Sequence, residues 1–282
     1  RHAHQNGIDA VLIQDLGMYD LIHQKFPNLE IHASTQMHIH NLDGALVAEK
    51  LGFKRIVLAR ETDIATIKEI KKKTNLDLEV FVHGSLCVSY SGQCLFSSLV
   101  GGRSGNRGAC AGSCRLPYDI VDKNNAVLNQ NKKYPLSMKD LCAISSIGTL
   151  MDIGVNSFKI EGRMKSKEYV YLVTKLYRKS IDSYIANKKV TIDYNILDKL
   201  RKVFNREYTL GFLNSVNNND VINGKQPNNV GVKIGTVVKL TKSNALIKLN
   251  DEIHINDGLR IKGPNGEVGT SVNDFYLNGN LV

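Results

Sequence analysis

The sequence of 282 residues contains no apolar run long enough to span a bilayer, and it has no signal peptide. We therefore expect a cytoplasmic protein that has no membrane partner. The protease signatures His-Glu-x-x-His and Gly-x-Ser-x-Gly are missing as well. The first residue is Arg1, which lies in a helical pattern, so we interpret the chain as a fragment that lacks its natural N-terminus.

Cysteines are few, but four of the five lie in one stretch, residues 79–119, which we call the cysteine loop. Without a secretory signal, they argue against a disulfide framework and favour a metal site or a catalytic role. The fifth, Cys142, lies in a helical pattern, and we expect it to be a buried core thiol. Gly, Ser, Asn and Arg dominate much of the loop, and so long an irregular segment within a compact domain is usually functional.

The formal net charge is +10. This excess of positive charge fits either a solvated basic surface or a polyanionic partner, for which nucleic acid is the first candidate. No arginine-rich tail or basic repeat decides between the two.

Five short apolar runs are expected to be strands. They cover residues 10–14, 30–36, 55–60, 78–82 and 157–160. Helical spacing of apolar residues is seen over 41–51, 64–70 and 166–185, and residues 137–140 have the pattern of a capping box before another helix. Short strands that alternate with helices predict parallel βαβ units, either in an open sheet or in part of a (β/α)8 barrel.

Polar side chains recur at or just after the ends of these strands. They are Asp15, Gln36, Glu61, His83, and the group Lys159, Glu161 and Arg163. Barrel enzymes place their active-site groups at this end of the strands, so the recurrence favours a barrel with an active site at its mouth.

The cysteines follow the pattern C-x6-C-x15-C-x3-C, formed by Cys87, Cys94, Cys110 and Cys114. Four thiolates suit tetrahedral zinc or an iron–sulfur cluster, and the spacing leaves the choice open. Arg103, Arg107 and Arg115 bracket the last two cysteines. They would lower thiolate pKa values and offset the charge of a cluster, or bind an anionic substrate. A nucleophilic pair of His83 with Cys87 is the alternative to a metal site.

The second half of the chain changes character. Residues 1–214 are expected to form the α/β domain, and residues 215–229, rich in Asn, Gly and Pro, a linker. From residue 230 to residue 282 apolar residues alternate with polar ones between turn signals. This pattern predicts a small all-β, barrel-like domain.

The run from Glu79 to Ser97 (EVFVHGSLCVSYSGQCLFS) closely resembles the signature of peptidase family U-32, the collagenase-like proteins. The resemblance continues over residues 103–118, 137–141, 158–163 and 204–206, covers nearly the whole chain, and looks closest to the bacterial members that act on tRNA. It implies a (β/α)8 barrel of which this chain lacks the first strands.

The resemblance also implies a chemistry. Well-understood members support hydroxylation of the tRNA wobble uridine to 5-hydroxyuridine, of a ribosomal RNA cytidine, or of the ubiquinone ring. The tRNA members are thought to need prephenate. Ubiquinone-pathway members hold a 4Fe-4S cluster on four cysteines, which by motif fall on Cys87, Cys94, Cys110 and Cys114 here, with zinc as the alternative metal.

The leading hypothesis is therefore a cytoplasmic, cluster-dependent tRNA hydroxylation enzyme. We expect Glu161, His83 and Lys159 to be catalytic, with Glu161 or His83 handling protons. The residues expected to bind substrate are Gln36, Glu61, Arg103, Arg107, Arg115 and Arg163. For Lys159, Glu161 and Arg163 the structural alternative is an ion-pair network around the mouth. The competing functions are a peptidase that cleaves collagen-like substrates and a non-catalytic, cluster-binding subunit that works with a homologous partner.

Overall fold

The computed structural model describes residues 2–215, 217–241, 244–264, 266–277 and 280–281. The chain divides into two compact units, residues 1–231 and residues 232–282. Among the described residues, no helix combines the length and the apolar character that crossing a membrane requires.

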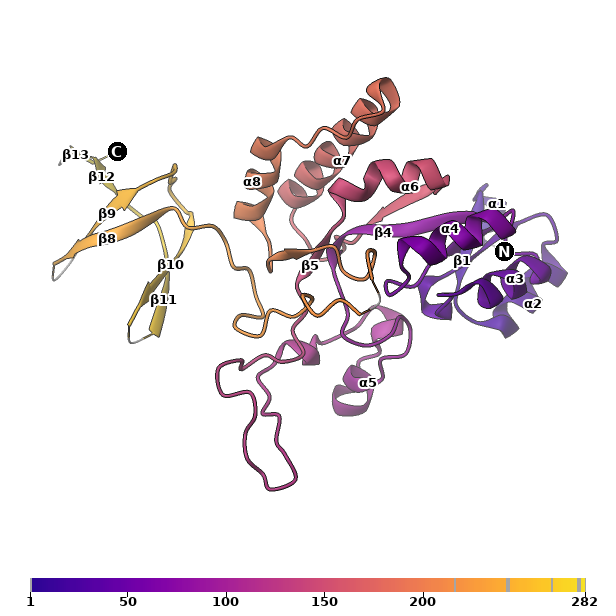
Figure 1. Ribbon diagram of the computed structural model, residues 1–282, viewed down its shortest axis with the longest axis horizontal. Coiled ribbons are helices and arrows are strands. Elements are labelled where there is room, and N and C mark those ends of the chain that lie inside the picture. The colour runs from indigo at the N-terminus through magenta and orange to yellow at the C-terminus, as the bar shows by residue number, and fades with distance from the viewer. Residues whose placement is uncertain (1, 216, 242–243, 265, 278–279, 282) are drawn as a thin grey trace. The chain divides into compact units, whose positions relative to one another are not determined.

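The five predicted strands form a parallel sheet in the first unit. They are β1 (Ala10–Ile13), β2 (Glu30–Ala33), β3 (Arg55–Val57), β4 (Asp77–Ser85) and β6 (Ser157–Ile160). Each of them pairs with the next in this order, without reversal. The predicted α/β class with a parallel sheet is therefore confirmed (Figure 1).

Helices connect the strands of the sheet or follow them. The unit contains α1 (His2–Gln5), α2 (Leu16–Lys25), α3 (Leu42–Leu51), α4 (Ile64–Lys73), α5 (Phe96–Gly101), α6 (Ile147–Ile153), α7 (Lys167–Asn187) and α8 (Tyr194–Val203). Side-chain oxygens of Asp15, Asn41, Asp63, Ser166 and Asp193 cap α2, α3, α4, α7 and α8 by accepting a backbone N–H three residues on. Each cap satisfies a donor that the first helical turn leaves unpaired, so these residues fix where the helices begin.

The core lies between the sheet and the helices. Ile56 and Leu78 project from neighbouring strands and are fully buried, as are Ile67 and Ile70 at helical spacing on α4. Burying a side chain of this size contributes about 1.5–3 kcal/mol, so the core holds the strand ends in fixed positions.

The helix predicted after residues 137–140 is wrong. Asp140–Cys142 instead form a strand, β5, which pairs antiparallel with the end of β4 and parallel with β7 (Tyr208–Thr209). The hydroxyl of Ser137 does not cap a helix, because it accepts a hydrogen bond from the guanidinium of Arg115. The sheet thereby continues past β4 along the path β1-β2-β3-β4-β5-β7.

The strand pairs seen over the described residues leave this sheet open. A closed (β/α)8 barrel is therefore not shown. The parallel strands pair in sequence order, without the reversal that a doubly wound sheet has at its switch point.

Residues 221–231 fall largely in the interval where we expected a linker, and they belong to the first unit. Ile222 forms a β-bridge with Met138, and the N–H of Asn223 donates to the carbonyl of Ser137. Val221 and Asn223 are buried.

The second unit contains short antiparallel strand pairs. They are β8 (Gly235–Leu240) with β9 (Ala245–Leu249), β10 (Gly258–Gly263) with β11 (Gly266–Ser271), and β12 (Tyr276–Leu277) with β13 (Asn280–Leu281). The described pairs remain three separate ribbons, so the predicted barrel-like closure is not shown.

Candidate active site at the strand ends

A half-buried ion pair lies on one face of β4 and β6. Lys159 Nζ is 2.9 Å from Glu79 Oε1, and the hydroxyl of Ser157 donates to the other oxygen at 3.0 Å. Burial opposes the ionisation of Glu79, but the hydrogen bond and the charge of Lys159 outweigh it and hold the pKa of this carboxyl below its ordinary value. Lys159, expected to be catalytic, thus neutralises a carboxylate of the neighbouring strand.

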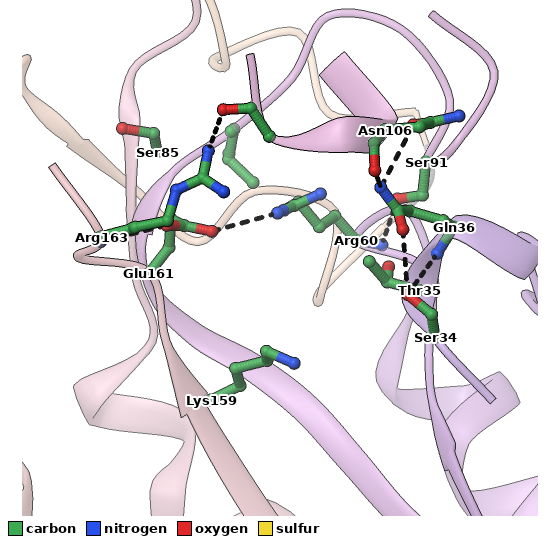
Figure 2. A network of polar contacts seen from close by, with 12 residues as sticks. Ser34, Thr35, Gln36, Arg60, Ser85, Ser91, Asn106, Lys159, Glu161 and Arg163 are labelled. Atoms are coloured by element: carbon green, nitrogen blue, oxygen red, sulfur yellow. Dashed lines mark hydrogen bonds and ion pairs between the residues drawn. The ribbon is translucent and has the colours of Figure 1, made fainter. Parts of the chain in front are cut away.

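Glu161 lies just beyond β6, where its carboxylate faces Arg60 across the strand ends (Figure 2). Arg60 NH2 is 3.6 Å from Glu161 Oε2, and its guanidinium carbon is 4.1 Å from the ring centre of Phe81. The side chain of Glu161 is 37% exposed, so its carboxylate is within reach of a ligand. This pairing supplies a carboxylate and a cation at the end of the sheet.

The backbone at the end of β4 passes very close to the backbone of Glu161. Gly84 has φ = +109°, and a Cβ atom there would lie 2.4 Å from the carbonyl oxygen of Glu161. The N–H of Glu161 also donates to the carbonyl of His83 at 2.8 Å. Only glycine fits this conformation and this approach, so Gly84 sets the position of Glu161.

His83 lies outside the strand-end group. The register of β4 against β6 shifts between Phe81, which pairs with Lys159, and His83, which pairs with Ile160. This bulge turns His83 toward α7, where its ring lies 5.6 Å from Tyr177 and 6.0 Å from Tyr169 between ring centres.

His83 is 1% exposed, its Nδ1 is 3.3 Å from the hydroxyl of Tyr177, and its Nε2 has no partner among the described residues. Burial lowers the pKa of His83 to about 3. The imidazole is therefore neutral and closed off from ligands, and the proton-handling role expected for it does not fit this position.

Gln36 and Glu61, expected to bind substrate, hold the cysteine loop. Glu61 accepts hydrogen bonds from the N–H and the hydroxyl of Ser91 at 2.8 and 2.9 Å. The amide of Gln36 donates to the carbonyl of Asn106 at 2.8 Å (Figure 2). The side chain of Asn106 in turn donates to the carbonyl of Gly92. The ends of β2 and β3 thus fasten the loop over the strand ends.

Two arginines of the cysteine loop, Arg115 and Arg103, form hydrogen bonds within the protein. Arg115 is half-buried and donates to the hydroxyl of Ser137 and to the carbonyls of Met138 and Leu86. Arg103 donates to the carbonyl of Ala109 at 2.9 Å. Both guanidinium groups thus donate hydrogen bonds to backbone carbonyls.

Arg163 and Arg107 are the two other arginines that were expected to bind substrate. Arg163 NH2 donates to the carbonyl of Gly108 at 2.6 Å, which ties the segment after β6 to the loop. Arg107 is exposed. Arg107 is therefore the loop arginine best placed to meet a ligand from solvent.

The four loop cysteines are free thiols. Burial raises the pKa of Cys114, the charge of Arg115 opposes this, and negative charge on Cys87, Cys110 and Cys94 raises the pKa further. The four thiols therefore share one electrostatic neighbourhood. In the part of the chain that the structure describes, no three Cys, His, Asp or Glu side chains are spaced to hold a metal ion. The donor set has the chemistry of a thiolate metal site, without the geometry of a formed one.

Cys142 lies apart from this group. It sits in β5 and packs against the core, and burial raises the pKa of its thiol. This placement agrees with the expected core thiol, although its segment is a strand.

Three aromatic rings gather beside Glu61. His38 stacks on His40 with 4.5 Å between ring centres, and its other neighbour is Tyr90 at 5.4 Å. His38 Nε2 lies 2.9 Å from Glu61 Oε1, which positions the group. Tyr90 is 67% exposed, so the group offers an aromatic surface to solvent.

Sequence reasoning missed a second polar cluster at the ends of β4, β5 and β7. Arg206 donates to Asp140 Oδ1 at 3.3 Å and to the hydroxyl of Ser85 at 2.9 Å, and Lys165 and Arg115 lie close enough to affect the pKa of Asp140. We call Arg115, Asp140, Lys165 and Arg206 the Lys165 cluster. Asp140 and Arg206 stand in segments that carry the family resemblance, but no spacing rule links residues so far apart in sequence.

Comparisons with known proteins agree on one family. The model for Peptidase family U32 matches residues 1–223. The chain is 36% identical over 98% of its length to the "23S rRNA 5-hydroxycytidine C2501 synthase" of Escherichia coli (strain K12), and covers 43% of that protein. It is 37% identical over 73% of its length to the "tRNA hydroxylation protein P1" of Bacillus subtilis (strain 168), and covers 50% of it.

A third relative carries a different name. The chain is 38% identical over 91% of its length to a protein of Methanocaldococcus jannaschii named as an uncharacterized protease, and covers 66% of it. The chain spans about half the length of the two bacterial relatives, 43% and 50%.

Proposed function

The chain belongs to peptidase family U32, and from this membership we propose that it carries the active site of an RNA hydroxylation enzyme. The observation that carries the proposal is the meeting of Glu161 and Arg60 with the cysteine loop at one end of the parallel sheet. Relatives with 36% and 37% identity are named for hydroxylation of ribosomal RNA and of tRNA.

The substrate we propose is tRNA, with the wobble uridine converted to 5-hydroxyuridine. A net charge of +10 favours a polyanionic partner. The exposed rings of His40 and Tyr90 suit an unpaired base, because bases in RNA loops stack on aromatic side chains. A base must leave its stack to reach a site at the ends of the strands.

We propose that Cys87, Cys94, Cys110 and Cys114 hold a 4Fe-4S cluster, with zinc as the alternative. The four thiols lie in one loop and influence one another electrostatically, which supports a shared ligand. A bound cluster would supply one-electron redox chemistry next to the strand ends.

The chain's own residues would bind and orient the substrate. Glu161 is the exposed carboxylate and would hold or move a proton, and Arg60 is its ion-pair partner. Arg107 would contact phosphate from the exposed side of the loop. Prephenate, the proposed co-substrate, would bring carboxylates to the cations at this end of the sheet.

We further propose that the sheet is an arc of a (β/α)8 barrel and that a homologous partner subunit completes the active complex. The uninterrupted order of the five parallel strands supports the arc. The active site would then lie at the barrel mouth, as it does in other enzymes of that architecture.

The test is a nucleoside analysis of tRNA and ribosomal RNA from a strain that lacks the gene for this chain. We expect 5-hydroxyuridine derivatives to disappear from tRNA, to return with the intact gene, and not to return with Cys87→Ser. Loss of 5-hydroxycytidine from ribosomal RNA alone would move the substrate to ribosomal RNA.

If neither RNA changes, the hydroxylation proposal fails. Gelatin cleavage by the purified protein would then favour the peptidase. An iron-loaded protein that is active only with a second subunit would favour the non-catalytic, cluster-binding role. Iron and sulfide near zero after anaerobic purification, with bound zinc, would contradict the 4Fe-4S assignment.

A further inference from the structure

The Lys165 cluster holds more positive than negative charge. Arg115, Lys165 and Arg206 surround a single buried carboxylate, that of Asp140, which is 2% exposed. Burial raises the pKa of Asp140, and the charges of Arg206, Lys165 and Arg115 oppose this rise. Three cations thus share one internal anion, at the end of the sheet where Glu161 also lies.

Lys165 contacts aromatic rings and forms no ion pair with a carboxylate in the described part of the chain. Its Nζ lies 2.8 Å from the ring centre of Phe204 and 5.7 Å from that of Tyr169. Over the described residues, no carboxylate oxygen comes within ion-pair distance of it. Burial, together with the charge of Arg206, lowers the pKa of Lys165 to about 8. A half-buried cation next to other cations is unfavourable unless an anion joins it.

The nearby carboxylates already have partners. Arg206 donates to both oxygens of Asp140, from its guanidinium and from its backbone N–H. Glu161 faces Arg60. Asp140 and Glu161, the two carboxylates that attract Lys165 electrostatically, are therefore ion-paired with other cations.

Unused donors lie in the same place. Nε of Arg206 is buried and has no hydrogen-bond acceptor among the described residues. The hydroxyl of Ser85 accepts a hydrogen bond from Arg206, so its own proton points elsewhere. One carboxylate or phosphate group can accept hydrogen bonds from an ammonium, a guanidinium N–H and a hydroxyl.

We propose that Lys165 and Arg206, with the hydroxyl of Ser85, form a binding site for one oxyanion group of a ligand, either a carboxylate or a phosphate. This site deepens the proposed function, on which its role in catalysis rests. It would fix the position of a substrate or co-substrate by its anionic end, close to Glu161. The surplus positive charge of the cluster is then balanced when the ligand is bound.

Competitive acetylation of the full-length protein with acetic anhydride tests the site directly. Lys175, which is exposed and whose pKa the hydroxyl of Tyr171 raises, is the matched control on α7. At pH 7.5 we expect Lys165 to react at least about tenfold faster than Lys175, because much more of it is the free amine. Inorganic phosphate, malonate or an RNA stem-loop is then added to see which of them protects Lys165 and leaves Lys175 unchanged.

Protection by phosphate and the stem-loop would assign the site to RNA phosphate, and protection by malonate would assign it to a small carboxylate. Rapid labelling that none of the three slows would overturn the proposal, and so would equal reactivity of the two lysines.

Since Arg206 also supports Asp140, the variant for a second measurement is Lys165→Met. The protecting anion should raise the melting temperature of the wild type and of Lys175→Met, and it should not raise that of Lys165→Met. An equal rise in all three proteins would also overturn the proposal. Neither measurement uses RNA hydroxylation, so the anion site and the proposed function can fail independently.

Discussion

The titratable groups on the two sides of strand β4 differ in charge and in exposure. On one side Glu79 and Lys159 form an ion pair, and Glu161 faces Arg60 just beyond it. On the other side His83 lies among tyrosine rings, neutral, with Nε2 unpaired among the described residues. Paired charges within reach of ligands are suited to chemistry, whereas an isolated buried imidazole is suited only to packing.

One extra residue in β4 separates the two sides. In a regular strand His83 would share a face with Glu79 and Phe81, because side chains alternate with a period of two. The register shift between Phe81 and His83 places it opposite Ile160, on the other face. The bulge therefore decides which polar residue joins the site.

The largest expected effect is a difference in activity between two variants, one with a substitution on each side of β4. Glu161→Gln should lower the rate of the proposed RNA hydroxylation by about 10²-fold or more, because the exposed carboxylate can no longer take a proton. His83→Gln should change the rate by less than about threefold once it is corrected for folded protein. Initial rates on unmodified tRNA, with the folded fraction measured by circular dichroism, would show this.

A loss of activity in His83→Gln equal to that in Glu161→Gln would contradict the division between the two sides. Glu161→Asp is the conservative control, and it should recover part of the activity if the carboxylate itself is needed.

The close approach at Gly84 offers a second way to break the arrangement. Gly84→Ala should destabilise the protein by about 3 kcal/mol, because the left-handed backbone strain adds to a clash with the carbonyl of Glu161. Urea unfolding measures the change. Gly101, on α5, has no atom within 4 Å of an added Cβ, so Gly101→Ala should be neutral or slightly stabilising. Similar losses in both variants would show that the approach to Glu161 is not what constrains Gly84.

Sequence periodicity predicted the regular parts of this fold. The spacing over 41–51 and 166–185 became α3 and α7, and the apolar runs became the parallel strands. Such elements are predictable because each one repeats a local pattern over several residues. The strand β5 has three residues, which are too few to show a periodic pattern. Ser137, shortly before it, has the sequence pattern of a helix cap, but in the structure its hydroxyl accepts a hydrogen bond from Arg115.

The site was predictable only in outline. Polar residues at the strand ends foretold where Glu161 and Glu61 would lie. The bulge that removes His83 from the site has no signal in the sequence, because Val80, Phe81 and Val82 form a continuous apolar run without alternation. The pairing of Asp140 with Arg206 joins residues that are 66 apart, and sequence spacing carries no information about such contacts.

The burial of His83 should make the stability of the protein depend on pH in the acidic range. Its pKa is about 3 in the folded protein and near 6.5 when exposed, so the unfolded chain takes up the proton first as the pH falls. The stability is therefore complete above pH 6.5 and is lost progressively toward pH 3. We expect about 2 kcal/mol to be lost between pH 7 and pH 5.

Urea titrations at several pH values would measure this loss. His83→Gln should flatten the pH dependence in that range, while His40→Gln, on an exposed histidine, should keep it. A wild-type slope in His83→Gln would mean that another group is responsible.

The smallest expected effect is on the free energy of unfolding, when two lysine–glutamate pairs are removed in turn. Glu79→Gln removes a partly buried charge and leaves Lys159 with a weaker acceptor, so it should cost about 1–2 kcal/mol of the free energy of unfolding. Glu69→Gln removes the partner of Lys73 from the exposed surface of α4, where such pairs contribute less than about 0.5 kcal/mol. Salt at 1 M should erase the smaller effect and leave most of the larger one, because screening acts mainly on exposed charges. If salt erased both, the pair of Glu79 and Lys159 would be a surface contact and not part of the framework that holds the strand ends.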